Sequence, residues 1–155
     1  MDRLLVALAL AAVAVGVALL VQRRRPGPAP APSPDGFRAP DQLDRADFPR
    51  PEAPWLVAVF TSATCSTCAA VRERAQVLDS ADVAVCDVEV GERPDLHTRY
   101  GIEAVPIVVV ADSAGVARAS FVGPVSATHL WAAVAEAREP GSVPEGCSGH
   151  DDAEG

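Results

Sequence analysis

Two cysteines separated by two residues, Cys65 and Cys68, are the pair of side chains in this sequence best suited to chemistry. A thiol with an ordinary pKa of about 8.5 becomes a reactive thiolate at neutral pH when a helix N-terminus lowers that pKa. The C-x-x-C spacing lets one sulfur attack a disulfide and the other resolve the mixed disulfide that forms. The pair predicts redox chemistry, with Cys65 attacking and Cys68 resolving.

Two other interpretations of the pair stay open at this point, half of a zinc site and an inert structural pair. Zinc would require a second C-x-x-C or two histidines, and neither Cys86 nor Cys147 has such a partner. We therefore expect no metal and no other cofactor. Cys86 lies in a strand-like run and is expected to be a small buried apolar residue.

Cys147 lies in a polar tail close to His150 and Asp151. These are all metal-ligand types, so the tail could act as a metal clasp, and its thiol could also exchange with the motif. Because so few protein ligands rarely suffice for zinc, we expect an idle thiol there.

The elements around the pair are a strand and a helix. Trp55–Phe60 is a short apolar run typical of a buried strand, and the mixed apolar and charged residues from about Cys65 to Leu78 predict a helix with one wet face. Later patterns predict further elements, in chain order: a strand at Val83–Val88, a short helix at Pro94–Tyr100, a strand at Pro106–Val110, a turn at Ala111–Gly115, a strand at Val116–Val122 and a helix at Thr128–Arg138.

Length and charge limit the classes of function. A chain of 155 residues is long enough for one domain once its ends are set aside, and a net charge of −8 leaves no basic patch for nucleic acid. Four cysteines at this length do not form a disulfide framework.

The N-terminal run Leu4–Val21 carries no charge and would be about 27 Å long as a helix, close to the thickness of a hydrocarbon core. We expect an uncleaved, single-pass transmembrane anchor. A secretory signal peptide is the alternative, but Arg23–Arg25 follow the run where a cleavage site would stand. Because basic residues are more numerous after the span than before it, we expect the rest of the chain to be cytoplasmic.

The chain therefore divides into four parts: an anchor with its basic flank (1–25), a Pro-rich linker (26–47), a folded domain (48–138) and an acidic, disordered tail (139–155). Asp41–Phe48 could form one short amphipathic helix, with Leu43 and Phe48 packing on the domain.

Three features in this order resemble the thioredoxin family over Trp55 to about Arg138. Cys65-Ser66-Thr67-Cys68 matches the C-x-x-C position of that family, and Tyr100–Ile107 resembles its segment before a cis-proline. Phe121–Ser126, followed by a helix, is similar to its last strand and turn. The resemblance implies an α/β thioredoxin-like fold, with a central mixed sheet of about four strands flanked by helices and preceded here by the transmembrane helix.

The chain also departs from that family. Thr64 stands where thioredoxins have a tryptophan, Ser66-Thr67 replaces their Gly-Pro, and Val59 replaces a buried aspartate that helps to deprotonate the resolving thiol. Without that carboxylate, we expect the proton of Cys68 to leave through water or Thr67, and we expect slow resolution.

The resemblance implies a thiol–disulfide oxidoreductase, with Cys65 and Cys68 as the catalytic residues. It assigns substrate binding to Thr64, Val105, Pro106 and Gly123, with Pro106 in the cis form so that the backbone of Val105 can pair with an extended substrate. The partners are then protein disulfides and an external electron donor. A cytoplasmic domain would act as a reductase, and one outside the cell as an oxidant or isomerase. The alternative is a non-catalytic, membrane-tethered interaction module.

Overall fold

The computed structural model describes residue 15 and residues 36–142. Apart from residue 15, the predicted membrane span at Leu4–Val21 lies outside the described residues, and so do the first part of the linker and most of the tail. Within the part that is described, no helix is both long and apolar enough to cross a membrane.

A four-stranded mixed sheet lies at the centre, in the order β2-β1-β3-β4. Strand β1 pairs parallel with β2 and antiparallel with β3, which in turn pairs antiparallel with β4. The strands are β1 (Trp55–Thr61), β2 (Val83–Glu89), β3 (Ile107–Asp112) and β4 (Ala117–Val122). The α/β class and the strand number are as predicted.

Strand β3 is longer than predicted. Ala111, which the sequence placed in a turn, instead pairs with Leu56 and is fully buried. The reversal therefore comes later, after Asp112, whose carboxylate accepts the backbone N–H groups of Ala114 and Val116. Asp112 stabilises this turn, and the apolar run before it does not show from the sequence where the strand ends.

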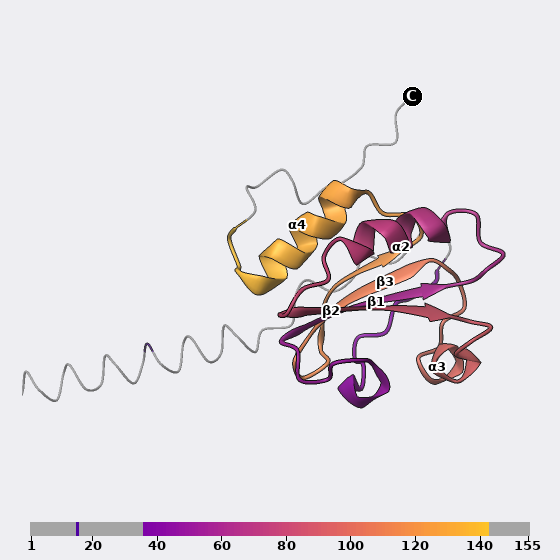
Figure 1. Cartoon of the computed structure of the whole chain (residues 1–155), viewed down its shortest axis with the longest axis horizontal. Coiled ribbons are helices and arrows are strands. Elements are labelled where there is room, and N and C mark those ends of the chain that lie inside the picture. Colours follow the sequence, from indigo (N-terminus) through magenta and orange to yellow (C-terminus); the bar gives the residue numbers. More distant parts are fainter. Residues whose placement is uncertain (1–14, 16–35, 143–155) are drawn as a thin grey trace, which may run out of the picture.

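Helical segments cover both faces of the sheet (Figure 1). On one face lie α2 (Cys68–Gln76) and α4 (Ala127–Arg138), and on the other lie α3 (Pro94–Arg99) and the single 3-10 turn η1 (Arg45–Asp47). Ser126 caps α4 by accepting the N–H of His129, and Pro94 opens α3.

The core has two halves because successive residues of a strand point to opposite faces. The half under α2 and α4 contains Val57, Val59, Val71, Ala75, Val108, Val110, Leu130 and Val134. The half under α3 and η1 contains Leu43, Phe48, Leu56, Phe60, Leu96, Ile107 and Val109. With both faces covered, the two central strands are apolar along their length, which is why they read as continuous hydrophobic runs.

The N-terminal segment joins the domain earlier than predicted. Leu43 is 0% exposed, and its N–H donates to the carbonyl of Gly115 at 2.8 Å. Gly115 has a φ of +78°, and a Cβ there would lie 1.9 Å from the carbonyl oxygen of Leu43, so only glycine fits. The packed body therefore begins near Ala39 rather than Phe48, and the helix expected at Asp41–Phe48 is reduced to η1.

Arg45 also holds this N-terminal segment against the domain. Its guanidinium is nearly buried and donates to the carbonyls of Asp112, Arg50 and Ala53, each at 3.1 Å. Burial lowers the pKa of Arg45, and the charge of Asp112 opposes that shift. One side chain thus ties the entry segment to the end of β3.

Candidate active site

Cys65 and Cys68 form a disulfide just beyond the C-terminal end of β1, with their Cα atoms 5.4 Å apart. Cys65 is half-buried, whereas Cys68 is 3% exposed. Cys65 is thus the more accessible residue of the pair, which fits the predicted order of attack and resolution.

The loop that carries Cys65 is held by its own short polar side chains. The N–H of Cys65 donates to the carbonyl of Ser62 at 3.1 Å. The hydroxyls of Ser62 and Thr64 lie 3.0 Å apart, and the N–H of Thr64 donates to Ser62 Oγ. Thr64 itself is exposed next to Cys65, as a contact for a substrate requires.

The helix after the loop starts later than predicted, at Cys68 rather than Cys65. Thr67 is its N-cap residue, but its side chain caps no backbone N–H. Instead, Thr67 Oγ1 lies 3.6 Å from Cys65 Sγ. The Thr67 hydroxyl thus contacts the sulfur of Cys65, and the expectation that Thr67 could carry the proton of Cys68 stays a prediction. The uncapped first turn of α2 leaves N–H groups whose partial positive charge favours a thiolate.

Pro106 follows a cis peptide bond, as predicted. Phe60 pairs with Ile107, so Val105 and Pro106 lie at the same end of the sheet as the loop of Cys65. The N–H of Gly123 donates to the carbonyl of Pro106 at 2.8 Å and brings that glycine to the same end. All the predicted site residues are therefore gathered there.

Val105 is half-buried, and within residues 36–142 neither its N–H nor its C=O makes a hydrogen bond. A backbone donor and acceptor left open at a strand end can pair with an extended peptide. The expected role of Val105 remains a prediction that this geometry allows.

Glu89 is a site residue that the sequence analysis missed. Its carboxylate accepts the N–H groups of Ala63 at 2.8 Å, Gly91 at 2.6 Å and Glu92 at 3.1 Å. The hydrogen bond from Ala63, chiefly, lowers the pKa of Glu89. An acidic residue at the end of a predicted strand was the only signal, and it does not reveal which loop the side chain reaches.

Cys86 is half-buried rather than fully buried, and it packs against the half of the core under α3. Burial, followed by the charge of Asp87, raises the pKa of the Cys86 thiol. A thiol with a raised pKa is a poor nucleophile, so Cys86 is a weaker candidate than Cys65 for the attacking thiol.

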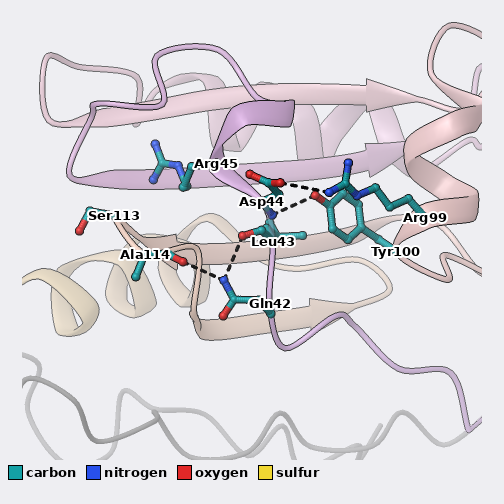
Figure 2. Close-up of a pocket in the computed structure, with 8 residues that line it drawn as sticks. All are labelled: Gln42, Leu43, Asp44, Arg45, Arg99, Tyr100, Ser113 and Ala114. Carbon is teal, nitrogen blue, oxygen red and sulfur yellow. Dashed lines mark hydrogen bonds and ion pairs between the residues drawn. The ribbon is translucent and has the colours of Figure 1, made fainter.

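Within residues 36–142, no metal cluster lies at this site, and a surface hollow lies elsewhere. Among the described residues, no three Cys, His, Asp or Glu side chains are placed to hold a metal ion, and Cys147 lies outside them. An open hollow of about 490 Å³ lies between residues that include Gln42, Arg99, Tyr100 and Ala114, and Figure 2 draws the side chains that line it. It lies beside the β3–β4 turn, at the opposite end of the sheet from the disulfide, because Trp55 at the start of β1 pairs with Asp112.

No family model matches the sequence. No curated protein matches it either. Three similar solved structures are thioredoxins. A mutant thioredoxin from Halobacterium salinarum is 24% identical with a TM-score of 0.48, over 61% of this chain and 89% of that one. Mitochondrial thioredoxin 3 from Saccharomyces cerevisiae, in its oxidised form, is 23% identical with a TM-score of 0.47, over 55% and 80%. Thioredoxin O2 from Arabidopsis thaliana, also oxidised, is 24% identical with a TM-score of 0.48, over 56% and 77%.

Independently of these overlaps, the molecule itself carries the features that the sequence predicted. The strand order, the disulfide after β1 and the cis-proline before β3 occur together at one end of one sheet. The described domain has a thioredoxin-like fold, with the Cys65–Cys68 disulfide just after β1.

Proposed function

We propose that the protein is a thiol–disulfide oxidoreductase that acts on protein disulfides. The observation that carries this proposal is the unequal exposure of the two sulfurs in one Cys65–Cys68 disulfide. In the reduced enzyme, the Cys65 thiolate attacks a substrate disulfide and releases one substrate thiol. Cys68 then attacks Cys65, the Cys65–Cys68 bond forms again, and the second substrate thiol leaves. An external donor restores the dithiol.

The arrangement at the site supports each step. Thr67 Oγ1 and the uncapped start of α2 stabilise a thiolate at Cys65. The open N–H and C=O of Val105 can align an extended substrate segment beside it. Thr64 and Gly123 border the same place, and no prosthetic group enters the reaction.

The test is turnover. The protein should accelerate the reduction of insulin disulfides by dithiothreitol, whereas a passive interaction module should not. We expect Cys65→Ser to abolish the acceleration and Cys68→Ser to accumulate mixed disulfides. Cys86→Ser is the matched control, because it removes a thiol on the same sheet without touching the pair. Turnover that survives Cys65→Ser would contradict the proposal.

We further propose that Leu4–Val21 anchors the protein in a membrane, with the domain on the cytoplasmic side. Support comes from the length of the apolar run and from Arg23–Arg25 after it. The full-length protein should stay with membranes through a high-salt and an alkaline wash, and a reporter fused at Gly155 should be active only on the cytoplasmic side. A shortened, soluble protein would overturn the anchor. A reporter active outside would overturn the orientation and favour an oxidant or isomerase.

A further inference from the structure

Resolution of the mixed disulfide requires the thiol of Cys68 to lose a proton, because the thiolate is the attacking species. Cys68 is 3% exposed, so bulk water has little access to it. Val59, on the face of β1 that α2 covers, is fully buried and has no ionisable group. A nearby group that can accept a proton would therefore speed the deprotonation of Cys68.

The neighbouring strand supplies a carboxylate at this level. Asp87 on β2 is in register with Val59 on β1, and both lie on the face covered by α2. Thr61 Oγ1 donates to Asp87 Oδ1 at 2.6 Å, and the Thr61 side chain is itself buried. The Asp87 side chain is 26% exposed, so it is partly shielded but keeps contact with solvent.

Arg72 links this carboxylate to the helix that begins with the resolving cysteine. Arg72 Nη1 lies 3.3 Å from Asp87 Oδ2. Arg72 is one helical turn after Cys68, so their Cβ atoms are about 6 Å apart on one side of α2. Side chains on a helix lean towards its N-terminus, so the Arg72 side chain extends back towards Cys68. The carboxylate is thus held on two sides, by the end of β1 and by the turn of helix that begins with Cys68.

We propose that Asp87 accepts the proton of Cys68 during resolution, through the Thr61 hydroxyl or one water molecule. The inference rests on the proposed function. The Cys68 S–H proton passes to the Asp87 carboxylate, and the thiolate attacks Cys65 Sγ. The Cys65–Cys68 bond forms while the bond from Cys65 to the substrate sulfur breaks. Cys68 is oxidised, the substrate sulfur is reduced and leaves as a thiolate, and Asp87 returns its proton to that thiolate or to water.

The charged surroundings of Asp87 fit a group that exchanges a proton. From α2 it faces Arg72, and along β2 it has Glu89 two residues away on the same face. From β1 it faces only the uncharged Thr61 and Val59.

The experiment is the reaction of the reduced protein with 5,5′-dithiobis(2-nitrobenzoate), followed by stopped flow. Attack by Cys65 releases a first coloured thiolate, and resolution by Cys68 releases a second. We expect Asp87→Asn to slow the second phase at neutral pH on the order of tenfold and to leave the first phase unchanged. The second phase should then rise in proportion to hydroxide as the pH increases, and Asp87→Glu should restore part of the rate.

Asp82→Asn is the matched control. It removes one carboxylate from the residue just before β2, where Asp82 pairs with Arg138 at 3.4 Å, at the far end of that strand from the dithiol. Thr61→Val is a second test of the same path, because it removes the hydroxyl bonded to Asp87, and it should also slow the second phase alone.

An unchanged second phase in Asp87→Asn, or an equal slowing of both phases, would overturn this inference and leave the proposed function intact. A wild-type protein that shows no first phase would overturn the proposed function and this inference with it.

Discussion

Glu89 Oε1 accepts the backbone N–H of Ala63 at 2.8 Å, which fastens the loop before Cys65 to the end of β2. The hydrogen bonds from Ala63, Gly91 and Glu92 favour the ionised carboxylate and hold the pKa of Glu89 below its ordinary value. Folding with a lowered pKa gives stability that is present above the unfolded pKa of about 4.3. That stability is lost as the pH falls through the lower, folded value.

The first prediction follows from this carboxylate. Glu89→Gln should be less stable than wild type at neutral pH, and the two proteins should converge in stability as the pH falls below about 4. Urea unfolding midpoints measured from neutral to acidic pH would check this. Glu92→Gln removes a charge from the same turn and should follow the wild-type pH dependence. A constant difference between Glu89→Gln and wild type at all pH values would contradict the account.

The second prediction concerns Thr67, whose hydroxyl lies 3.6 Å from Cys65 Sγ. Thr67→Val removes a donor to the thiolate, so the pKa of the Cys65 thiol should rise and its alkylation at neutral pH should slow about threefold. Because the Thr67 side chain caps no backbone N–H, helix α2 should be unaffected. Iodoacetamide alkylation across a pH range measures the shift, and Thr67→Ser should behave as wild type. An effect on unfolding but not on alkylation would show a structural role instead.

The third prediction concerns Val59. Val59→Asp, made in the Asp87→Asn protein, should restore the second phase of the dithiobis(nitrobenzoate) reaction, because it returns a carboxylate to the same level of the sheet. In wild type it should help less, because two carboxylates in register repel and one stays protonated. Either variant should lose about 2 kcal/mol of stability, because Val59 is fully buried. Equal rates with and without Val59→Asp in a folded Asp87→Asn protein would contradict this prediction.

The fourth prediction tests the entry segment. Arg45→Ala deprives three backbone carbonyls of their donor and should lower the free energy of unfolding by roughly 3 kcal/mol. Chemical denaturation measures the loss. Arg38→Ala, at an exposed position in the same segment, should change the stability little. A comparable loss of stability in both variants would mean that any lost positive charge in this segment destabilises the domain, and not the loss of the three Arg45 hydrogen bonds in particular.

The sequence predicted the parts of the molecule that local pattern determines. The short apolar run from Trp55 to Phe60 predicted a buried strand, and the two cysteines after it marked the candidate site. The cis form of Pro106 came from the family resemblance, because no propensity around it selects that isomer. In these cases, residues close in the sequence or in the same motif were enough for the prediction.

The missed features all depend on contacts between distant segments. The prolines around Leu43 and Arg45 indicate a spacer, and only the far turn at Gly115 shows that these residues pack. The pairing of Val59 with Asp87 depends on the register of β1 against β2, which neither strand specifies alone. The reach of Glu89 to Ala63 is likewise a product of tertiary structure. The sequence therefore located the cysteine pair but not Asp87 and Glu89 on the neighbouring strand.

The place where the N-terminal segment is fastened also determines how the domain bears a mechanical load. Leu43 N–H donates to Gly115 and Ala117 N–H donates to Asp41, both beside the β3–β4 turn, at the opposite pole from Cys65. A force on the chain ahead of Asp41 acts first on this corner. There the isolated bridge between Gln42 and Val116 can separate before the strands of the sheet do. The strands that carry the dithiol come under tension only afterwards. A domain held from this corner therefore points its disulfide away from the attachment. The Gln42–Val116 bridge lies between the attachment and the Cys65–Cys68 disulfide, so it can break first and leave the disulfide region intact.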